Sequence, residues 1–235
     1  SGGSNMSVSI SKCSSNGTVT GSDAVVGGFV GAINTGTNTI TFSDCVNNGT
    51  VTGSQTDVGG FIGKIESGAN TIALSACVNN GTITGPRSDV GGFFGAIDNT
   101  ENATILVSNS INNANVTSPF DAGGFFGSIK QSKNLSVTVS KCVNNGVISC
   151  SDKYGGFIGY IYMNTIMVIQ FIDNQNNGVM ISSSQGSFGG GFVGFLYGNR
   201  NLNMKMENIT NHGNSSGGSY VGGIIGSVWK KIGRA

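Results

Sequence analysis

The sequence predicts an all-β fold, a single-stranded triangular β-helix (β-solenoid) of about seven coils of 32 residues, with three short strands per coil. Three observations predict it: a glycine motif at a fixed period, apolar residues in phase with this motif, and Asn-Gly corners at one position of the repeat. The motif is Gly-Gly-apolar-apolar-Gly, and its seven copies begin at Gly27, Gly59, Gly91, Gly123, Gly155, Gly190 and Gly222. The period is 32 residues, with one step of 35 between the fifth and sixth copies. A fixed period of this length is typical of a repeat architecture.

The second repeat shows how one coil is expected to fold. Residues 39–43 alternate between polar and apolar side chains, which indicates a strand with one buried face. Asn47-Asn48-Gly49 is expected to form a corner, because Asn and Gly tolerate left-handed backbone conformations. A second strand is predicted over 50–53 and a third over 58–65.

Residues at the same place in successive repeats are expected to stack along the axis. One apolar row is Val8, Ile40, Ile72, Ile105, Val137, Ile169 and Met204. The glycine motif adds a second row, Phe29, Phe61, Phe93, Phe125, Phe157, Phe192 and Ile224. Each repeat then buries its apolar side chains on its neighbours, so stability comes from stacking. The solenoid is predicted to span residues 8–229, with 1–7 as a linker or fragment start and 230–235 as a tail.

Composition argues against several classes of function. Charged residues make up 10% of the chain and the formal net charge is +1, so no basic field exists to hold nucleic acid. No apolar run approaches the roughly 20 residues that cross a bilayer. The single histidine, His212, falls in a corner, and most acids are scattered. These features predict a protein that is not an enzyme and has no catalytic residues.

Three aspartates form the exception among the scattered acids. Asp57, Asp89 and Asp121 occupy one position of three successive repeats, just before the third predicted strand. One interpretation is that each aspartate bonds to the backbone at its own corner. The other is a column that binds a hard cation such as Ca²⁺, the only cofactor that the sequence suggests.

The residue after each motif aromatic defines an apolar stripe. Its members are Val30, Ile62, Phe94, Phe126, Ile158, Val193 and Ile225. If the strand alternates strictly, this stripe faces outward and forms an interaction surface. If the double glycine bends the strand, both columns pack inside.

Glycosylation motifs recur at the corners. Of the Asn-x-Ser/Thr sequences, Asn16, Asn48, Asn80 and Asn115 are candidate glycan sites, because they fall at predicted corners. The same pattern also arises by chance in a chain rich in Asn and Thr.

The repeat resembles the GLUG-motif repeat of secreted and surface adhesin-like proteins. The resemblance is carried by Cys45-Val46-Asn47-Asn48-Gly49-Thr50-Val51-Thr52-Gly53 followed by Val58-Gly59-Gly60-Phe61-Ile62-Gly63. It implies an extracellular or cell-surface setting and transfers no catalytic residue. The expected function is a non-catalytic segment with a rigid surface for weak multivalent binding of glycans or extracellular proteins. The alternative is a structural stalk, a spacer, or a filament subunit that binds other copies of itself.

Overall fold

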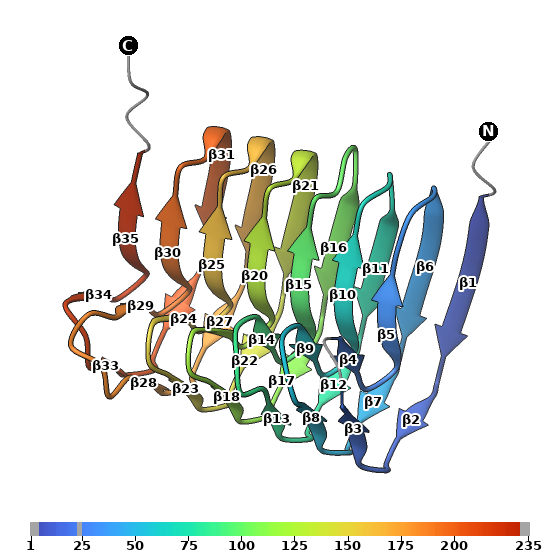
Figure 1. The fold of residues 1–235 in the computed structure, drawn as a ribbon, viewed down its shortest axis with the longest axis horizontal. Coiled ribbons are helices and arrows are strands. Elements are labelled where there is room, and N and C mark those ends of the chain that lie inside the picture. The colour runs from blue at the N-terminus through green and yellow to red at the C-terminus, as the bar shows by residue number, and fades with distance from the viewer. Residues whose placement is uncertain (1–4, 23–24, 231–235) are drawn as a thin grey trace.

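The computed structural model describes residues 5–22 and 25–230, and this part of the chain is an all-β solenoid of seven coils (Figure 1). The strands form five parallel sheets of seven strands each, and every coil contributes one strand to each sheet. The two ends of the chain lie at opposite ends of the stack. The predicted β-solenoid is therefore confirmed. Residues 1–4 of the predicted linker and 231–235 of the predicted tail lie outside the described residues.

The five sheets are numbered here in the order in which a coil enters them. Sheet 1 contains β1 (Met6–Ser11), β6 (Asn38–Ser43), β11 (Thr71–Ser75), β16 (Thr104–Ser108), β21 (Lys133–Ser140), β26 (Thr165–Ile172) and β31 (Arg200–Glu207). Sheet 2 contains β2 (Ser14–Ser15), β7 (Val46–Asn47), β12 (Val78–Asn79), β17 (Ile111–Asn112), β22 (Val143–Asn144), β27 (Gln175–Asn176) and β32 (Thr210–Asn211). Sheet 3 contains β3 (Val19–Gly21), β8 (Val51–Gly53), β13 (Ile83–Thr84), β18 (Val116–Ser118), β23 (Ile148–Cys150), β28 (Met180–Ile181) and β33 (Ser215–Ser216).

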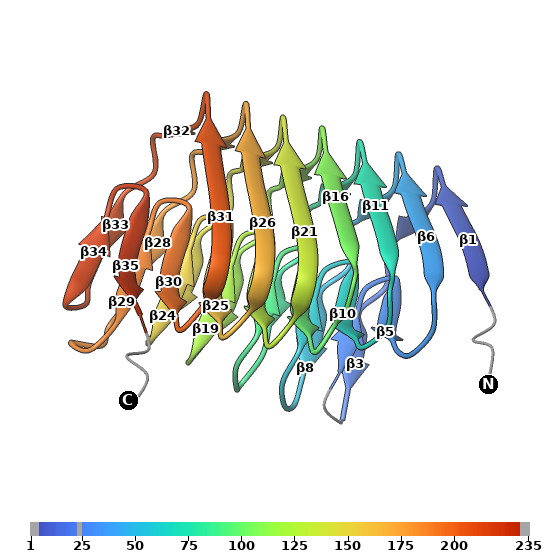
Figure 2. The same cartoon turned by 90° about the horizontal axis from the view of Figure 1, so that it is seen from above.

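The glycine motif joins the last two sheets. Sheet 4 contains β4 (Val26–Gly27), β9 (Val58–Gly59), β14 (Val90–Gly91), β19 (Asp121–Gly123), β24 (Lys153–Gly155), β29 (Phe188–Gly190) and β34 (Tyr220–Gly222). Sheet 5 contains β5 (Val30–Ile33), β10 (Ile62–Glu66), β15 (Phe94–Asp98), β20 (Phe126–Lys130), β25 (Ile158–Tyr162), β30 (Val193–Tyr197) and β35 (Ile225–Trp229). Figure 2 shows sheet 1 from above as an array of strands perpendicular to the long axis.

The number of strands per coil differs from the prediction, which was three. In the second coil, the predicted third strand over 58–65 is two strands, β9 and β10, which belong to different sheets. The chain bends between them at Gly60 and Phe61. A further short strand, β7, begins at Val46 in front of the predicted Asn-Gly corner.

This bend decides where the apolar stripe lies. Ile62, Phe94, Phe126, Ile158 and Val193 are all fully buried, so the expectation of an exposed stripe is wrong for these five residues. Val30 and Ile225, in the first and last coils, are partly buried and pack against the same core. Because the chain changes direction at the double glycine, both the aromatic residue and its successor point inward, as the alternative interpretation expected.

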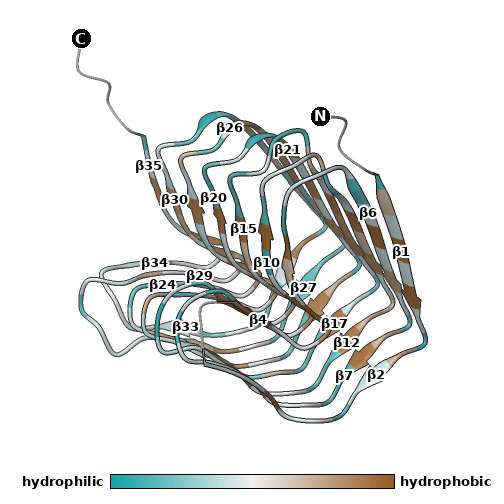
Figure 3. Cartoon of the chain, turned by 45° about the vertical axis from the view of Figure 1, so that its right-hand side comes forward, coloured by the Kyte–Doolittle hydropathy of each residue, from teal (hydrophilic) through white to brown (hydrophobic). Residues whose placement is uncertain are grey.

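Each coil encloses two cores. The larger core holds the apolar side chains of sheets 1 and 5, and the smaller core lies between sheets 3 and 4. Viewed obliquely, the two arms of each coil meet at an angle and leave an inward bend on one side (Figure 3). In the larger core, Phe29, Phe61, Phe93, Phe125, Phe157 and Phe192 stack with ring centroids 4.7–4.9 Å apart. This spacing is the strand-to-strand distance of a sheet, so every coil repeats the same packing.

Two ladders of asparagine amides run along one corner in opposite directions. The inner ladder is fully buried up to Asn176, and each amide nitrogen donates to the next coil, as from Asn112 Nδ2 to Asn144 Oδ1 at 2.8 Å. The outer ladder is exposed and donates toward the preceding coil, as from Asn113 Nδ2 to Asn80 Oδ1 at 2.9 Å. The inner ladder is Asn47, Asn79, Asn112, Asn144, Asn176 and Asn211. Buried amides paired in this way keep their hydrogen bonds inside a low-dielectric corner.

Candidate binding face

The inward bend between sheets 4 and 5 brings three rows of side chains together, and we call their common surface the re-entrant face. The row at the start of sheet 4 is Asp57, Asp89, Asp121, Lys153, Phe188 and Tyr220. The first row on sheet 5 is Lys64, Ala96, Ser128, Tyr160, Phe195 and Ser227. The second row on sheet 5 is Glu66, Asp98, Lys130, Tyr162, Tyr197 and Trp229.

The rows of the re-entrant face differ from the other ladders because their residue types change along the axis. The core ladders repeat one residue type from coil to coil, as the stacked phenylalanines and asparagines do. The row at the start of sheet 4 instead passes from acids and Lys153 to Phe188 and Tyr220, and the second row on sheet 5 passes from acids and Lys130 to tyrosines and Trp229. The first row on sheet 5 changes from Lys64 through Ala96 and Ser128 to Tyr160 and Phe195. Stacking alone does not require this change, so these positions are free to carry a binding function.

Lysines and acids alternate in the charged half of the re-entrant face, which comprises the acids and lysines of coils two to four together with Asp152 and Lys153. Lys64 Nζ lies 3.9 Å from Asp57, 3.1 Å from Glu66 and 3.5 Å from Asp98. Lys130 Nζ donates to Asp89 Oδ2 at 2.5 Å. These pairs are more than three-quarters buried at the lysine ends, so water screens them less than it screens surface ion pairs.

The next coil closes the charged half. Lys153 Nζ contacts Asp121 at 3.2 Å and Asp152 at 2.5 Å. The same ammonium lies 4.8 Å from the centre of the Tyr160 ring. It therefore joins the charged half to the aromatic residues of coils five to seven, which we call the aromatic half.

The charged half holds more acids than lysines. Its ion pairs involve six carboxylates, Asp57, Glu66, Asp89, Asp98, Asp121 and Asp152, and three lysines, Lys64, Lys130 and Lys153. Six minus three leaves an excess of three negative charges when every group is ionised. Three buried oxygens on this face, Asp89 Oδ1, Asp98 Oδ1 and Ser128 Oγ, also have no hydrogen-bond partner among the described residues. The face therefore holds fewer cations and hydrogen-bond donors than its carboxylates and hydroxyl groups could accept.

Burial and crowding of the acids raise two of the pKa values. Desolvation, together with the neighbouring Asp89, raises the pKa of Asp57 to about 7, although Lys64 and Lys130 oppose the shift. Desolvation also raises the pKa of Asp121 to about 7, against the attraction of Lys153. Burial disfavours the charge of Lys130, but its carboxylate neighbours, Asp89 foremost, outweigh this effect and raise its pKa overall.

We expect the stability of the protein to fall as the pH rises from about 4 to about 7. In this window the folded state keeps protons on Asp57 and Asp121 that the unfolded chain has already released, because the ordinary pKa is 3.8. The two groups together are expected to change the free energy of unfolding by roughly 2–5 kcal/mol across the window. Thermal melts of the wild type and of Asp57→Asn/Asp121→Asn check this. The double variant should show a flatter profile, and an equally steep one would contradict the assignment.

The aromatic half is a continuous cluster of rings. Tyr160 stacks on Phe195 with centroids 5.6 Å apart, and Tyr162 stacks on Tyr197 at 5.7 Å. Trp229 lies perpendicular to Phe195, at 5.3 Å. Tyr162 and Tyr197 are partly exposed, and their hydroxyl groups have no partner within the part of the chain that the structure describes. The cluster thus presents ring edges and free phenol groups at the inward bend.

The structure does not support a calcium site at the three predicted aspartates. Asp57, Asp89 and Asp121 do stack on successive coils, but all three are buried and each has a lysine ammonium as its cation. Within residues 5–22 and 25–230, no group of three or more His, Cys, Asp or Glu side chains is arranged to hold a metal ion. Asp57 and Asp89 have φ angles of 58° and 64°, so they do occupy corner positions.

The candidate glycan sites lie on the surface, as predicted, but three of them belong to the outer asparagine ladder. Asn48 Nδ2 donates to Asn16 Oδ1 at 2.9 Å, and Asn80 Nδ2 donates to Asn48 Oδ1 at 2.8 Å. A glycan on one of these nitrogens competes with the ladder and crowds the sites one coil away. Asn115 is exposed and stands apart from this ladder, with its Oδ1 accepting from Val147 N at 3.1 Å. Glycosylation stays a prediction at all four residues.

Three other features carry no site of their own. Cys45, Cys77 and Cys142 are buried free thiols, and burial raises the pKa of Cys142 to about 12. His212 is exposed at its corner, where its backbone nitrogen donates to Asn176 O.

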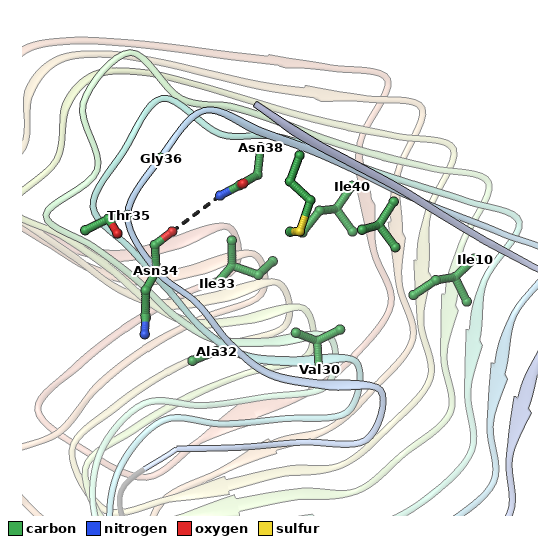
Figure 4. A pocket seen from close by; sticks show the side chains of 11 residues that line it. Ile10, Val30, Ala32, Ile33, Asn34, Thr35, Gly36, Asn38 and Ile40 are labelled. Atoms are coloured by element: carbon green, nitrogen blue, oxygen red, sulfur yellow. Dashed lines mark hydrogen bonds between the residues drawn. The ribbon is translucent and has the colours of Figure 1, made fainter. Parts of the chain in front are cut away.

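An apolar hollow of about 630 Å³ opens at the first coil, between β1 and β5 (Figure 4). Its lining includes Val8, Ile10 and Val30 at core positions of the first coil and Ile40 at a core position of the second.

Sequence reasoning missed the lysines and tyrosines of the re-entrant face. The signal was present in the repeats, because the two sheet 5 rows fall one and three residues after the last glycine of each motif copy. The residue types of these columns change toward aromatic rings along the chain, while the glycine motif beside them stays constant.

Comparison of the chain with protein-family models, with curated proteins and with solved structures gave no match. No helix long and apolar enough to cross a membrane occurs in the described residues.

Proposed function

We propose that this chain is a non-catalytic binding segment of a secreted or cell-surface, adhesin-like protein, and that it binds glycans on the re-entrant face. The resemblance to the GLUG-motif repeat supports the extracellular setting and the adhesive role. The observation that carries the binding function is the change from charged residues to aromatic rings along the re-entrant face, beside ladders that otherwise repeat.

The chemistry of this face suits a polyhydroxylated ligand. The phenol groups of Tyr162 and Tyr197 both donate and accept hydrogen bonds, and the rings offer apolar surface to the C–H groups of a sugar. Carboxylates and ammonium groups on the neighbouring coils supply further acceptors and donors. The coils repeat every 4.7–4.9 Å along the axis, so a linear oligosaccharide lying along the rows meets equivalent positions repeatedly. Several weak contacts then add up to useful avidity.

Binding to a glycan array, followed by titration of the best oligosaccharide, tests the proposal. Tyr162→Ala and Tyr197→Ala are each expected to weaken binding about tenfold, which corresponds to roughly 1.4 kcal/mol for lost ring contact and hydrogen bonding. Tyr162→Phe separates the two contributions, because it removes only the hydroxyl group.

Leu106→Ala is the matched control, since Leu106 is 41% exposed on sheet 1, away from the re-entrant face. Folding of every variant is verified by its thermal melt. Glycan binding that the tyrosine variants leave unchanged would refute the site. A folded protein that binds no glycan would favour the alternative function, a stalk, spacer or filament subunit.

A further inference from the structure

We propose that the charged half of the re-entrant face selects glycans that carry a free amine, so that the preferred ligand is an amino-sugar oligosaccharide. The inference rests on the proposed function and narrows its ligand class. It is drawn from the charge balance of the face, its unpartnered oxygens and the position of its exposed carboxylates beside the aromatic half.

The re-entrant face holds fewer positive than negative groups. Its ion pairs join six carboxylates and three lysines, and each lysine already contacts at least one acid. Every carboxylate has a lysine within 4 Å, but the acids outnumber the lysines. With Asp57 and Asp121 protonated at about pH 6, four ionised carboxylates face three lysines, so a ligand that brings positive charge still compensates an excess of one negative charge. An anionic ligand would add to the repulsion instead.

Buried acceptors independently indicate a missing donor. Ser128 is fully buried, and its hydroxyl oxygen has no partner among the described residues. Asp89 is 2% exposed, and its Oδ1 is equally unpartnered although its Oδ2 accepts from Lys130. Ser128 lies in register between Ala96 and Tyr160, so it belongs to the row that faces these acids. Polar atoms in such positions normally have a donor. Ser128 Oγ and Asp89 Oδ1 are themselves out of reach of a ligand, but they show that hydrogen-bond donors are in short supply around the acids of this face.

The accessible carboxylates lie within reach of a ligand on the tyrosines. The side chain of Glu66 is 45% exposed and that of Asp98 is 18% exposed. Both belong to the row that continues through Lys130 to Tyr162 and Tyr197. Asp98 is two coils from Tyr162, about 10 Å along the axis. A short oligosaccharide that contacts Tyr162 can thus place an ammonium group at Asp98.

The aromatic half also favours a cation at its border. Lys153 already holds its ammonium 4.8 Å from the Tyr160 ring centre while it contacts Asp121 and Asp152. We expect an amine of the ligand to bind in a similar way, with its ammonium group between carboxylates and a tyrosine ring.

Calorimetric titration with a matched pair of ligands tests the inference. The probes are a glucosamine oligomer and its fully N-acetylated counterpart, which share one backbone and differ in charge, at about pH 6, where the free amine is protonated. The amine-bearing oligomer is expected to bind at least tenfold more tightly, and this advantage should shrink as salt is added. Glu66→Gln/Asp98→Asn should reduce the advantage to less than threefold, because it lowers the affinity for the amine-bearing oligomer much more than the affinity for the acetylated one.

Three results would overturn the inference: equal affinity for the two oligomers, an array preference for neutral or acidic glycans, or an amine advantage that survives in Glu66→Gln/Asp98→Asn. Equally tight binding of poly-lysine, with no dependence on Tyr162, would make the partner a basic peptide and overturn it too. These failures differ from failure of the proposed function. If the acetylated oligomer binds and Tyr162→Ala weakens it, glycan binding on this face holds and only the selection for amines is lost.

Discussion

Gly92→Ala is expected to disrupt the stacking of the central coils and to lower the free energy of unfolding by more than about 4 kcal/mol. A Cβ atom at this position would lie 2.1 Å from the carbonyl oxygen of Gly124 in the next coil and 2.4 Å from Asn112 Oδ1. Real Cβ contacts are never this short, and the first of these atoms belongs to the backbone. The coils would have to separate, which breaks ladder hydrogen bonds on both sides. The measurement is urea denaturation followed by circular dichroism.

Gly186→Ala is the matched control, because nothing lies within 4 Å of a Cβ built at Gly186. Its expected effect is within about 0.5 kcal/mol of the wild type. A stable, normally folded Gly92→Ala would show that the coils are not packed as closely as described. The same contact recurs at Gly60, Gly124, Gly156 and Gly191, so the motif is explained by stacking alone.

Asn112→Ala is expected to lower the free energy of unfolding by about 2–4 kcal/mol, because it interrupts the buried amide ladder. The side chain accepts from Asn79 Nδ2 at 3.1 Å and donates to Asn144 Oδ1 at 2.8 Å. Its removal leaves the Asn144 oxygen buried without a donor. Asn79 is affected less, since its amide nitrogen also donates to Gly92 O at 2.7 Å.

Asn113→Ala provides the comparison one residue further along the chain. Asn113 takes part in the outer ladder, where it donates to Asn80 and accepts from Asn145, but it is exposed and water can replace both partners. We expect a loss below about 1 kcal/mol. Equal losses in the two variants, measured by urea denaturation, would show that burial does not distinguish the ladders.

The solenoid, its seven coils and the register of its core could be predicted from the sequence, because a repeat stacks identical positions on each other. The row that joins Val8 to Ile40 and continues to Met204 is paired residue by residue as expected. The number of strands per coil could not be predicted, since a bend at Gly60 and Phe61 depends on how closely the next coil approaches. The same bend buried Ile62 and Phe94, whose exposure a strictly alternating strand had suggested.

The residues of the re-entrant face are brought together only by the tertiary structure. Asp89 and Lys130 are 41 residues apart in the chain, and only the angle between sheets 4 and 5 brings the ammonium to the carboxylate. The aspartate column, which the sequence could suggest as a cation site, is likewise paired with lysines: Lys64 and Lys130 come from sheet 5, and Lys153 comes from the next coil of sheet 4. Periodicity by itself therefore determined what this chain repeats, because stacking requires like residues at like positions. Which rows meet, and which lysine pairs with which acid, depended on the fold of each coil across its width, because periodicity along the chain does not encode the angle between the sheets.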